Sequence, residues 1–408
     1  MSLTAQSPLI AGQETATARV TRIASVDILR ALTMVLMIFV NDLWSLTNIP
    51  VWLLHTTADQ DGMGLSDAIF PAFLFIVGMS IPFAINNRRK KGDSNGRIVL
   101  HILMRGGALL IMGVFLVNGE NLNAAATGMH RLLYFTLCCT SFILIWNAYP
   151  STVKPAVAWA ARAVGIITLL TLAFMVRGGE QGVTFTTYWW GILGLIGWSY
   201  LVCSIIYTFV GSSLVAVIAA WALMLVMSMA SNAGMISFGF LSFMMDPLSN
   251  GSLPFLTMGG IVISLLYLRF KKQNADGKML ALFAGMAALL FAAGLYTNKF
   301  WIIAKLGATP PWILICSGIT ITTFILVYWL ADIKGKANWF DVIKPAGTNT
   351  LLCYLIPYFS YAVVRLVGIH WPALMLDGVV GLIKSFVFAL LCVFIAGWLG
   401  KRGVQLKL

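Results

Sequence analysis

Apolar runs of about 20 residues recur along the whole chain, and short polar or charged segments separate them. A helix of this length crosses a hydrocarbon core, and in lipid the helix satisfies the hydrogen bonds of its own backbone. The sequence lacks the apolar/polar alternation that is typical of a transmembrane barrel. The pattern therefore predicts an all-α polytopic membrane protein with about a dozen spans. We place the spans near residues 29–48, 66–85, 99–117, 131–149, 157–175, 188–210, 213–231, 253–269, 279–296, 311–331, 347–367 and 378–399.

Composition agrees with this reading. Hydrophobic residues make up 60% of the 408 positions and charged residues only 10%, whereas soluble domains carry about 25% charged residues. A soluble globule of this length could not cover its surface with so few polar side chains. All six cysteines lie inside apolar runs, so we interpret them as small packing residues and not as disulfide partners. The first 25 residues are polar and show no signal peptide.

The net charge of +13 indicates topology and not nucleic-acid binding. Cytoplasmic loops carry an excess of Lys and Arg. With both termini in the cytoplasm, 21 of the 27 basic residues fall on the cytoplasmic side. The six on the outer side are Arg131, Arg177, Lys299, Lys305, Arg365 and Lys384. We therefore expect a multi-pass protein of the cell (inner) membrane, with both ends inside the cell.

The outer segments hold eight of the 14 acidic residues. An acidic outer face would suit a cationic or amine-bearing substrate. The alternative is that acidic residues are indifferent to topology. The sequence leaves both readings open.

The densest polar cluster runs from Asn41 to Ser80 and contains His55 between carboxyl-rich stretches. Histidine is the usual general base or acyl-accepting nucleophile at neutral pH. His55 is therefore the catalytic candidate, although a histidine packed at the membrane interface would look the same. Asp67 could orient this histidine, or it could cap the helix that follows it. The sequence contains no metal-ligand constellation, no phosphate-binding glycine loop and no GxSxG motif.

Two further polar positions stand out. Lys299 follows an apolar run, with Tyr296 and Trp301 nearby, and is either an interfacial anchor or a site residue. Asn349 lies just inside an apolar run and either bonds a neighbouring helix or belongs to a site. Gly78, the pair at 106–107 and the pair at 259–260 are expected to be close-packing points between helices.

One composite of short motifs is specific. Residues 25–32 read SVDILRAL, residues 40–41 read VN, His55 follows, and residues 65–73 read LSDAIFPAF. This order and spacing resemble the heparan-α-glucosaminide N-acetyltransferase family, whose members read V-D-x-x-R-G-L, V-N, a K-H-S-type histidine and A-D-L-V-F-P-W-F. Weaker similarities follow at residues 105–118, 191–200, 246–247, 297–301, 332–335 and 347–351.

The resemblance implies the transmembrane acyltransferase fold and transfer of acetyl from cytosolic acetyl-CoA to the amine of a terminal glucosamine across the membrane. The acceptor would be an extracytoplasmic sugar or glycan. It implies a catalytic role for His55, with Asn41 in support, and we add Asp67 to these catalytic candidates from its position. For acetyl-CoA we expect Arg30, Arg105, Asn349 and Lys299 as binding residues, and no metal.

The chain departs from the family in ways that bear on its substrates. Gly194-Leu195 stands where the family has Gln-Arg, so another cation would contact coenzyme A, and Arg105 and Arg131 are the candidates. Leu54-His55-Thr56 replaces K-H-S, so the acceptor need not be heparan.

We expect a cytoplasmic tail at 1–25, one transmembrane domain at 26–400 and a cytoplasmic tail at 401–408. Residues 120–185 would add a helix pair relative to the animal enzymes, whose luminal N-terminal domain is absent here. A homodimer is expected from symmetry and from the family. A secondary transporter for a polar solute is the alternative function, since about a dozen spans with both ends inside suit that class.

Overall fold

The computed structural model describes residues 24–236, 239, 242 and 250–408. Within this part of the chain all regular structure is helical, with only isolated β-bridges. The elements are α1 (Ala24–Asp42), η1 (Leu43–Ser45), η2 (Val51–Leu53), α2 (Leu65–Lys90), α3 (Asn95–Glu120), α4 (Ala124–Thr127), α5 (Arg131–Trp146), α6 (Pro155–Met175), α7 (Gly191–Val210), α8 (Leu214–Asn232), α10 (Ser252–Lys272), α11 (Asp276–Thr297), α12 (Pro310–Tyr328), η4 (Trp329–Ile333), η5 (Ala337–Phe340), α13 (Lys344–Thr348), α14 (Thr350–Leu366), η6 (Ala373–Leu376) and α15 (Gly378–Lys401).

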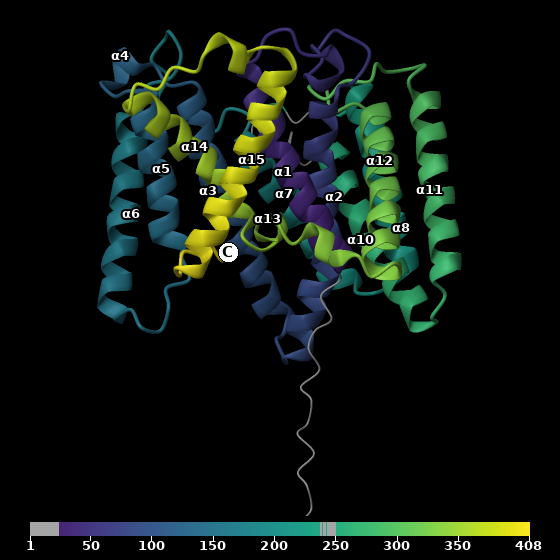
Figure 1. Cartoon of the computed structure of the whole chain (residues 1–408). Coiled ribbons are helices and arrows are strands. Elements are labelled where there is room, and N and C mark those ends of the chain that lie inside the picture. The colour runs from purple at the N-terminus through teal and green to yellow at the C-terminus, as the bar shows by residue number, and fades with distance from the viewer. Residues whose placement is uncertain (1–23, 237–238, 240–241, 243–249) are drawn as a thin grey trace, which may run out of the picture.

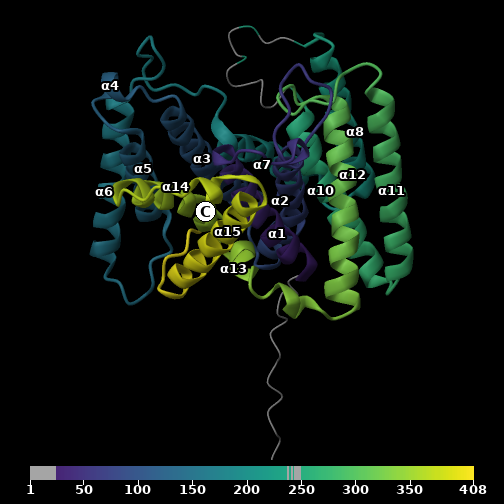
Figure 2. The ribbon, with the colours of Figure 1, turned by 45° about the horizontal axis from the view of Figure 1, so that its top comes forward.

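An apolar helix occupies each of the twelve predicted spans, which confirms the all-α polytopic fold. Ten helices of the described residues are long and apolar enough to cross a membrane. Two others, α5 and α14, are apolar but shorter, with 16 and 17 residues. Figure 1 shows the long helices running side by side, and Figure 2 shows α14 and α15 inclined to the rest. The predicted twelve full-length crossings are thus ten long helices and two short ones.

Successive spans run in opposite directions, so their ends form two faces. One face, here called the basic face, receives the ends of α2, α10 and α15, with Arg88, Arg89, Lys90, Arg269, Lys271, Lys272 and Lys401 in their last turns. The opposite face, here called the histidine face, carries the loop between α1 and α2 with His55 and the loop between α11 and α12. In Figure 1 the histidine face is at the top.

The helices differ in how much of their surface is buried, and they form a central group and an outer group. α10 is the most enclosed span, and α1 and α2 come next, whereas α6, α8 and α11 expose most of their apolar surface. Such exposed apolar helices are typical of contact with lipid. The site residues described below lie on or beside the central helices and are therefore held by the most densely packed part of the protein.

Glycines set the separation of α2 and α10. A Cβ at Gly78 would overlap the carbonyl oxygen of Thr257, and a Cβ at Gly260 would overlap that of Phe75. The two backbones approach this closely because neither residue has a side chain. The predicted close-packing points are confirmed at Gly78, Gly106 and at 259–260, whereas Gly107 faces open space.

Candidate functional site

The His55 loop is folded tightly against the start of α2. Ser66 Oγ donates to the carbonyl oxygen of Leu53 at 2.5 Å, and Gly62 N donates to Ile303 O at 3.0 Å. A Cβ at Gly64 would overlap the carbonyl oxygen of Leu54, so the loop can close here only around a glycine. His55 is therefore presented by a short segment that is fixed on both sides.

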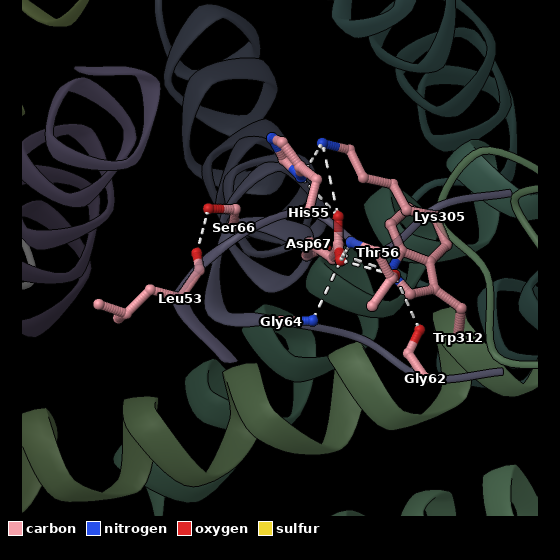
Figure 3. Close-up of polar contacts among 9 residues, drawn as sticks. All are labelled: Leu53, His55, Thr56, Gly62, Gly64, Ser66, Asp67, Lys305 and Trp312. Carbon is pink, nitrogen blue, oxygen red and sulfur yellow. Dashed lines mark hydrogen bonds and ion pairs between the residues drawn. The ribbon is translucent and has the colours of Figure 1, made fainter. Parts of the chain in front are cut away.

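Asp67 is the third residue of α2, and its two oxygens have different partners. Oδ2 accepts from Gly64 N at 3.1 Å, from Thr56 N at 3.1 Å and from Thr56 Oγ1 at 3.0 Å. Oδ1 lies 2.6 Å from Nδ1 of His55. The sequence left helix capping and histidine orientation open for Asp67, and the structure gives it both contacts: Oδ2 binds the donors at the helix start, and Oδ1 binds the imidazole (Figure 3).

The geometry fixes the tautomer of His55. A carboxylate oxygen only accepts hydrogen bonds, so the ring nitrogen that contacts it must carry the proton. Nε2 of the neutral ring is then left with its lone pair. The Asp67 side chain is fully buried, whereas the His55 side chain is 50% exposed, so the carboxylate is hidden and the imidazole remains accessible to a substrate.

Lys305, from the loop between α11 and α12, completes the group. Its Nζ lies 3.3 Å from His55 Nδ1 and 3.9 Å from Asp67 Oδ1. Burial lowers the pKa of the Lys305 ammonium, and the charge of Asp67 partly offsets this effect. Figure 3 shows the end of the lysine side chain beside His55 and Asp67.

Several contacts hold the Lys305 loop in place. Asp61 Oδ1 accepts from Ile303 N at 2.8 Å, and the amide of Asn298 donates to the same carboxylate. On the other side of the loop, Trp312 Nε1 donates to the carbonyl oxygen of Asp67 at 3.1 Å. Two outer loops that are distant in the sequence are thereby bound to each other and to the start of α2.

A small cavity of about 40 Å³ lies beside these groups. The cavity is lined by Met37, Val40, Asn41, His55, Ser66, Ile69, Phe70, Ile192, Lys305 and Tyr354. Asn41 thus lines the same space as His55, and the three predicted catalytic residues lie together: His55 and Asn41 on the cavity and Asp67 behind the histidine.

The residue next to Asn41 anchors the end of α1. Asp42 is buried and accepts from Lys384 Nζ at 2.8 Å, Ser385 Oγ at 2.6 Å and Tyr361 OH at 2.9 Å. The last turn of α1 is therefore tied to α14 and α15. Because Asn41 belongs to that turn, this cluster also fixes the helix end from which Asn41 projects.

The segment that carries His55 and Asp67 is similar to known proteins. Residues 22–121 match the family model described as heparan-alpha-glucosaminide N-acetyltransferase, catalytic. This segment resembles that family.

Two relatives make the comparison concrete. Heparan-alpha-glucosaminide N-acetyltransferase of Homo sapiens is 32% identical over 101 residues, which are 24% of this chain and 14% of the human protein. The Mus musculus protein of the same name is 31% identical over 109 residues, which are 26% of this chain and 15% of the mouse protein. The matched segments thus span about one seventh of the two relatives.

The family resemblance predicted from the sequence is confirmed for the segment 22–121, which contains Arg30, Asn41, His55, Asp67 and Arg105. The similarities noted further along the chain stay predictions, and the one at 246–247 lies outside the described residues. The heparan-alpha-glucosaminide N-acetyltransferase-like segment therefore supplies the His55–Asp67 pair, whereas Lys305 comes from outside it.

The four residues predicted to bind acetyl-CoA lie at different levels between the basic face and the histidine face. Arg30 is near the basic face and donates to Ser80 Oγ at 2.6 Å, Asp27 Oδ1 at 2.9 Å and Gly347 O at 3.2 Å. Asn349 lies close by, two residues after Gly347 and against Gly400 of α15. These two predicted ligands are thus brought together by α1 and the α13–α14 segment.

The other two predicted ligands lie elsewhere. The Arg105 guanidinium is in the middle of α3, 5.0 Å from the Tyr200 ring centroid, and its Nε is buried without a hydrogen-bond partner. Lys299 is exposed on the histidine face, with Nζ 5.5 Å from the Tyr296 ring centroid. The structure therefore does not bring Lys299 together with Arg30, Arg105 or Asn349.

Sequence reasoning missed Lys305 as a site residue. It singled out Lys299 in the same outer loop because of its aromatic neighbours, and it counted Lys305 only as an outer cation. The signal that favours Lys305 is its place four residues before Thr309-Pro310, where α12 begins. A lysine at that position is held close to the start of the helix, whereas Lys299 follows the end of α11.

Proposed function

We propose that this chain is a membrane-embedded acetyltransferase that moves an acetyl group from acetyl-CoA, bound from the basic face, to a sugar acceptor at the histidine face. The observation that carries the proposal is the 2.6 Å contact between a half-exposed His55 and a fully buried Asp67. This contact lies in the segment that resembles the catalytic family. A buried carboxylate that orients an accessible imidazole is an arrangement that general bases use.

The chemistry requires one proton acceptor. The acceptor nitrogen attacks the thioester carbonyl carbon, so a C–N bond forms and the C–S bond breaks. His55 Nε2 takes the proton that the nitrogen loses, and that proton later neutralises the coenzyme A thiolate. The products are the N-acetylated sugar and free coenzyme A. An acetyl-histidine at Nε2 is the two-step form of the same reaction, and a hydroxyl acceptor would follow the same course.

The route for the acetyl group follows one face of α1. Arg30, Met34, Met37 and Asn41 are spaced by three or four residues and so share a helix face. Arg30 lies near the basic face, and Met37 and Asn41 line the His55 cavity. Methionine side chains are flexible and adapt to their neighbours. We propose that Met34 and Met37 move aside to admit the slim pantetheine arm, while Arg30 holds phosphate.

Acetyl-CoA would enter from the basic face. A second cavity of about 350 Å³ there lies between the start of α1 and the segment from Ala337 to Thr348. Its two carboxylates are paired, Asp27 with Arg30 at 2.9 Å and Asp341 with Lys344 at 3.7 Å. Charge-assisted contacts from such cations suit phosphate groups. We propose that this region, with Arg30 and Asn349, holds the coenzyme. Arg105, in the middle of α3, lies apart from it, and Lys299, on the opposite face, would serve the acceptor side.

The orientation in the membrane follows from charge. Because cytoplasmic loops are rich in Lys and Arg, we propose that the basic face is cytoplasmic, in the cell (inner) membrane, with both termini inside. The acceptor, a terminal glucosamine-like sugar, would then be extracytoplasmic. The homodimer expected from the sequence stays a prediction.

The test uses the whole protein in detergent or nanodiscs, with acetyl-CoA and a panel of amino sugars. Free thiol release and sugar N-acetylation are followed for the wild type, His55→Gln and His370→Gln. We expect transfer by the wild type and a loss of about 10²–10⁴-fold in His55→Gln, the typical contribution of a positioned base. His370 is an exposed histidine outside the cavity, so its variant should resemble the wild type.

Equal thiol release by His55→Gln and the wild type would remove His55 from the mechanism. If the wild type releases no thiol but reconstituted vesicles accumulate a sugar, the transporter alternative replaces the acetyltransferase.

A further inference from the structure

The site contains one carboxylate and two groups that can carry positive charge beside it. Asp67 Oδ1 lies 2.6 Å from His55 Nδ1 and 3.9 Å from Lys305 Nζ, and the two nitrogens are only 3.3 Å apart. All three groups meet in Figure 3. The lysine side chain is 20% exposed and the aspartate 0%, so water screens these charges only partly.

The sum of the charges on Asp67, His55 and Lys305 indicates which of the two nitrogen groups is positively charged. With Asp67 ionised and Lys305 protonated, the group is neutral while the imidazole is neutral. A second proton on His55 would place a cation against an ammonium at 3.3 Å. An ordinary lysine holds its proton about four pH units longer than an ordinary histidine. The carboxylate of Asp67 favours the ammonium form of Lys305 and partly offsets the lowering of its pKa by burial, so the ammonium is the charge that balances Asp67.

We infer that Lys305 is a positioning residue for His55: its ammonium balances Asp67, so that the imidazole keeps a single proton on Nδ1 and presents a free Nε2 to the cavity. The inference rests on the proposed function for its purpose, since a base must hold its lone pair before it can accept the proton of the acceptor. Without Lys305, the carboxylate would have only the imidazole as a counter-charge. His55 would then keep a second proton to a higher pH, and less of it would be available as a base near neutral pH.

The other groups around His55 do not supply this counter-charge. From α1 the cavity receives Met37, Val40 and Asn41, and from α7 Ile192, all uncharged. Tyr354 of α14 lines the cavity with a phenol, which is neutral at physiological pH. The buried thiol of Cys316 in α12 interacts with Asp67 and Lys305, and a buried thiol is uncharged. The cation at this cavity is Lys305.

The test measures the protonation of His55 directly, without substrates. The protein has four histidines, so ¹³C-labelled histidine gives four ring signals by NMR, and the signal lost in His55→Gln identifies His55. Its titration midpoint is then recorded in the wild type, Lys305→Met, Lys305→Arg and Asp67→Asn. Arg365→Met is the control, because it removes an exposed cation at the histidine-face end of α14.

We expect the midpoint of His55 to rise by about one pH unit or more in Lys305→Met, since a unit charge 3.3 Å away has about that effect even in bulk water. Lys305→Arg should keep the wild-type midpoint, Arg365→Met should not move it, and Asp67→Asn should lower it. The acidic limb of the kcat/KM profile of Lys305→Met should move upward with the midpoint. Its rate should return toward the wild-type value at higher pH.

A midpoint that stays or falls in Lys305→Met overturns the inference, as does a rise in Lys305→Arg equal to that in Lys305→Met. A merely structural lysine would lower the rate at every pH and leave the midpoint unchanged. The two proposals fail separately: shifted midpoints in a protein that transfers no acetyl group would reject the function and keep the electrostatics. Acetyl transfer with unshifted midpoints would do the reverse.

Discussion

The Nδ1 atom of His55 lies 2.6 Å from Oδ1 of Asp67, and the other oxygen of the same carboxylate holds the start of α2. The orientation of the imidazole is thereby coupled to the beginning of a central helix. Rotating the carboxylate to release the histidine would also break its contacts with Gly64 and Thr56. The pair is consequently held as one unit, and a substitution in it should affect both the imidazole and the start of α2.

Asp67→Asn should abolish acetyl transfer and also lower stability, because it removes the counter-charge of Lys305. The amide oxygen can still accept from Gly64 and Thr56, but the amide nitrogen would donate to His55 Nδ1. The ring proton then moves to Nε2, where no lone pair remains for the acceptor. We expect kcat to fall by about 10²–10⁴-fold. The temperature of thermal unfolding in detergent should also fall, because Lys305 is left without its counter-charge. A rate near the wild type would contradict this role.

Lys384→Met should destabilise the protein without directly touching the cavity. The side chains of Asp42 and Lys384 are 6% and 14% exposed and lie 2.8 Å apart. Removing one partner of a buried pair leaves an uncompensated charge and costs about 3–5 kcal/mol. The measurement is the free energy of unfolding in detergent. The double variant Asp42→Asn/Lys384→Met should recover part of the loss, and a single variant as stable as the wild type would show that the pair is not needed.

Gly260→Ala should disturb the packing of α2 against α10. The new Cβ would overlap the carbonyl oxygen of Phe75 and lie 2.6 Å from Met79 N, and neither backbone atom can move alone. Overpacking costs about 1–3 kcal/mol even where side chains can adjust, so we expect at least that loss in thermal unfolding. The matched control is Gly285→Ala in α11, which meets nothing within 4 Å. Equal losses in both variants would argue against the contact.

Arg30→Gln should weaken acetyl-CoA binding more than it slows the chemical step. A hydrogen bond to a charged group contributes about 1.5–3 kcal/mol, so the KM for acetyl-CoA should rise roughly 10–100-fold. Lys272→Gln, at an exposed position of the basic face, is the control. A fall in kcat at unchanged KM would instead place Arg30 in support of the helix packing around Ser80 and Gly347.

Much of the fold could be predicted because lipid imposes it. Apolar runs located all twelve spans, and misjudged ends have local causes. The span predicted from residue 29 begins at Ala24, because polar Ser25 and Asp27 obscured its first turn. Its predicted end at 48 fell beyond Asp42, since a short 3-10 turn at Leu43–Ser45 follows the helix. The lengths of α5 and α14 were overestimated because α5 ends before Asn147 and because the short helix α13 and Asn349 precede α14.

The sequence predicted only those site contacts that join residues close together along the chain. His55 and Asp67 are 12 residues apart, so a motif and its spacing brought them together. Asp42 with Lys384 and Lys305 with His55 are separated by 342 and 250 residues. Their proximity depends on how α15 and the α11–α12 loop pack, which hydrophobic periodicity does not encode. For the same reason the sequence favoured Lys299 over Lys305, two lysines of one loop that only packing distinguishes.

Because Lys305 comes from a loop far from His55 in the sequence, the ribosome adds it long after the histidine. A ribosome adds about 5–20 residues per second, so the 250 residues between His55 and Lys305 take roughly 12–50 s to synthesise. During that interval the nascent chain already holds the histidine and the aspartate, with α11 and the loop after it still to come. The site therefore matures late in biosynthesis, and a chain arrested before Lys305 would carry the histidine–aspartate pair without its third member.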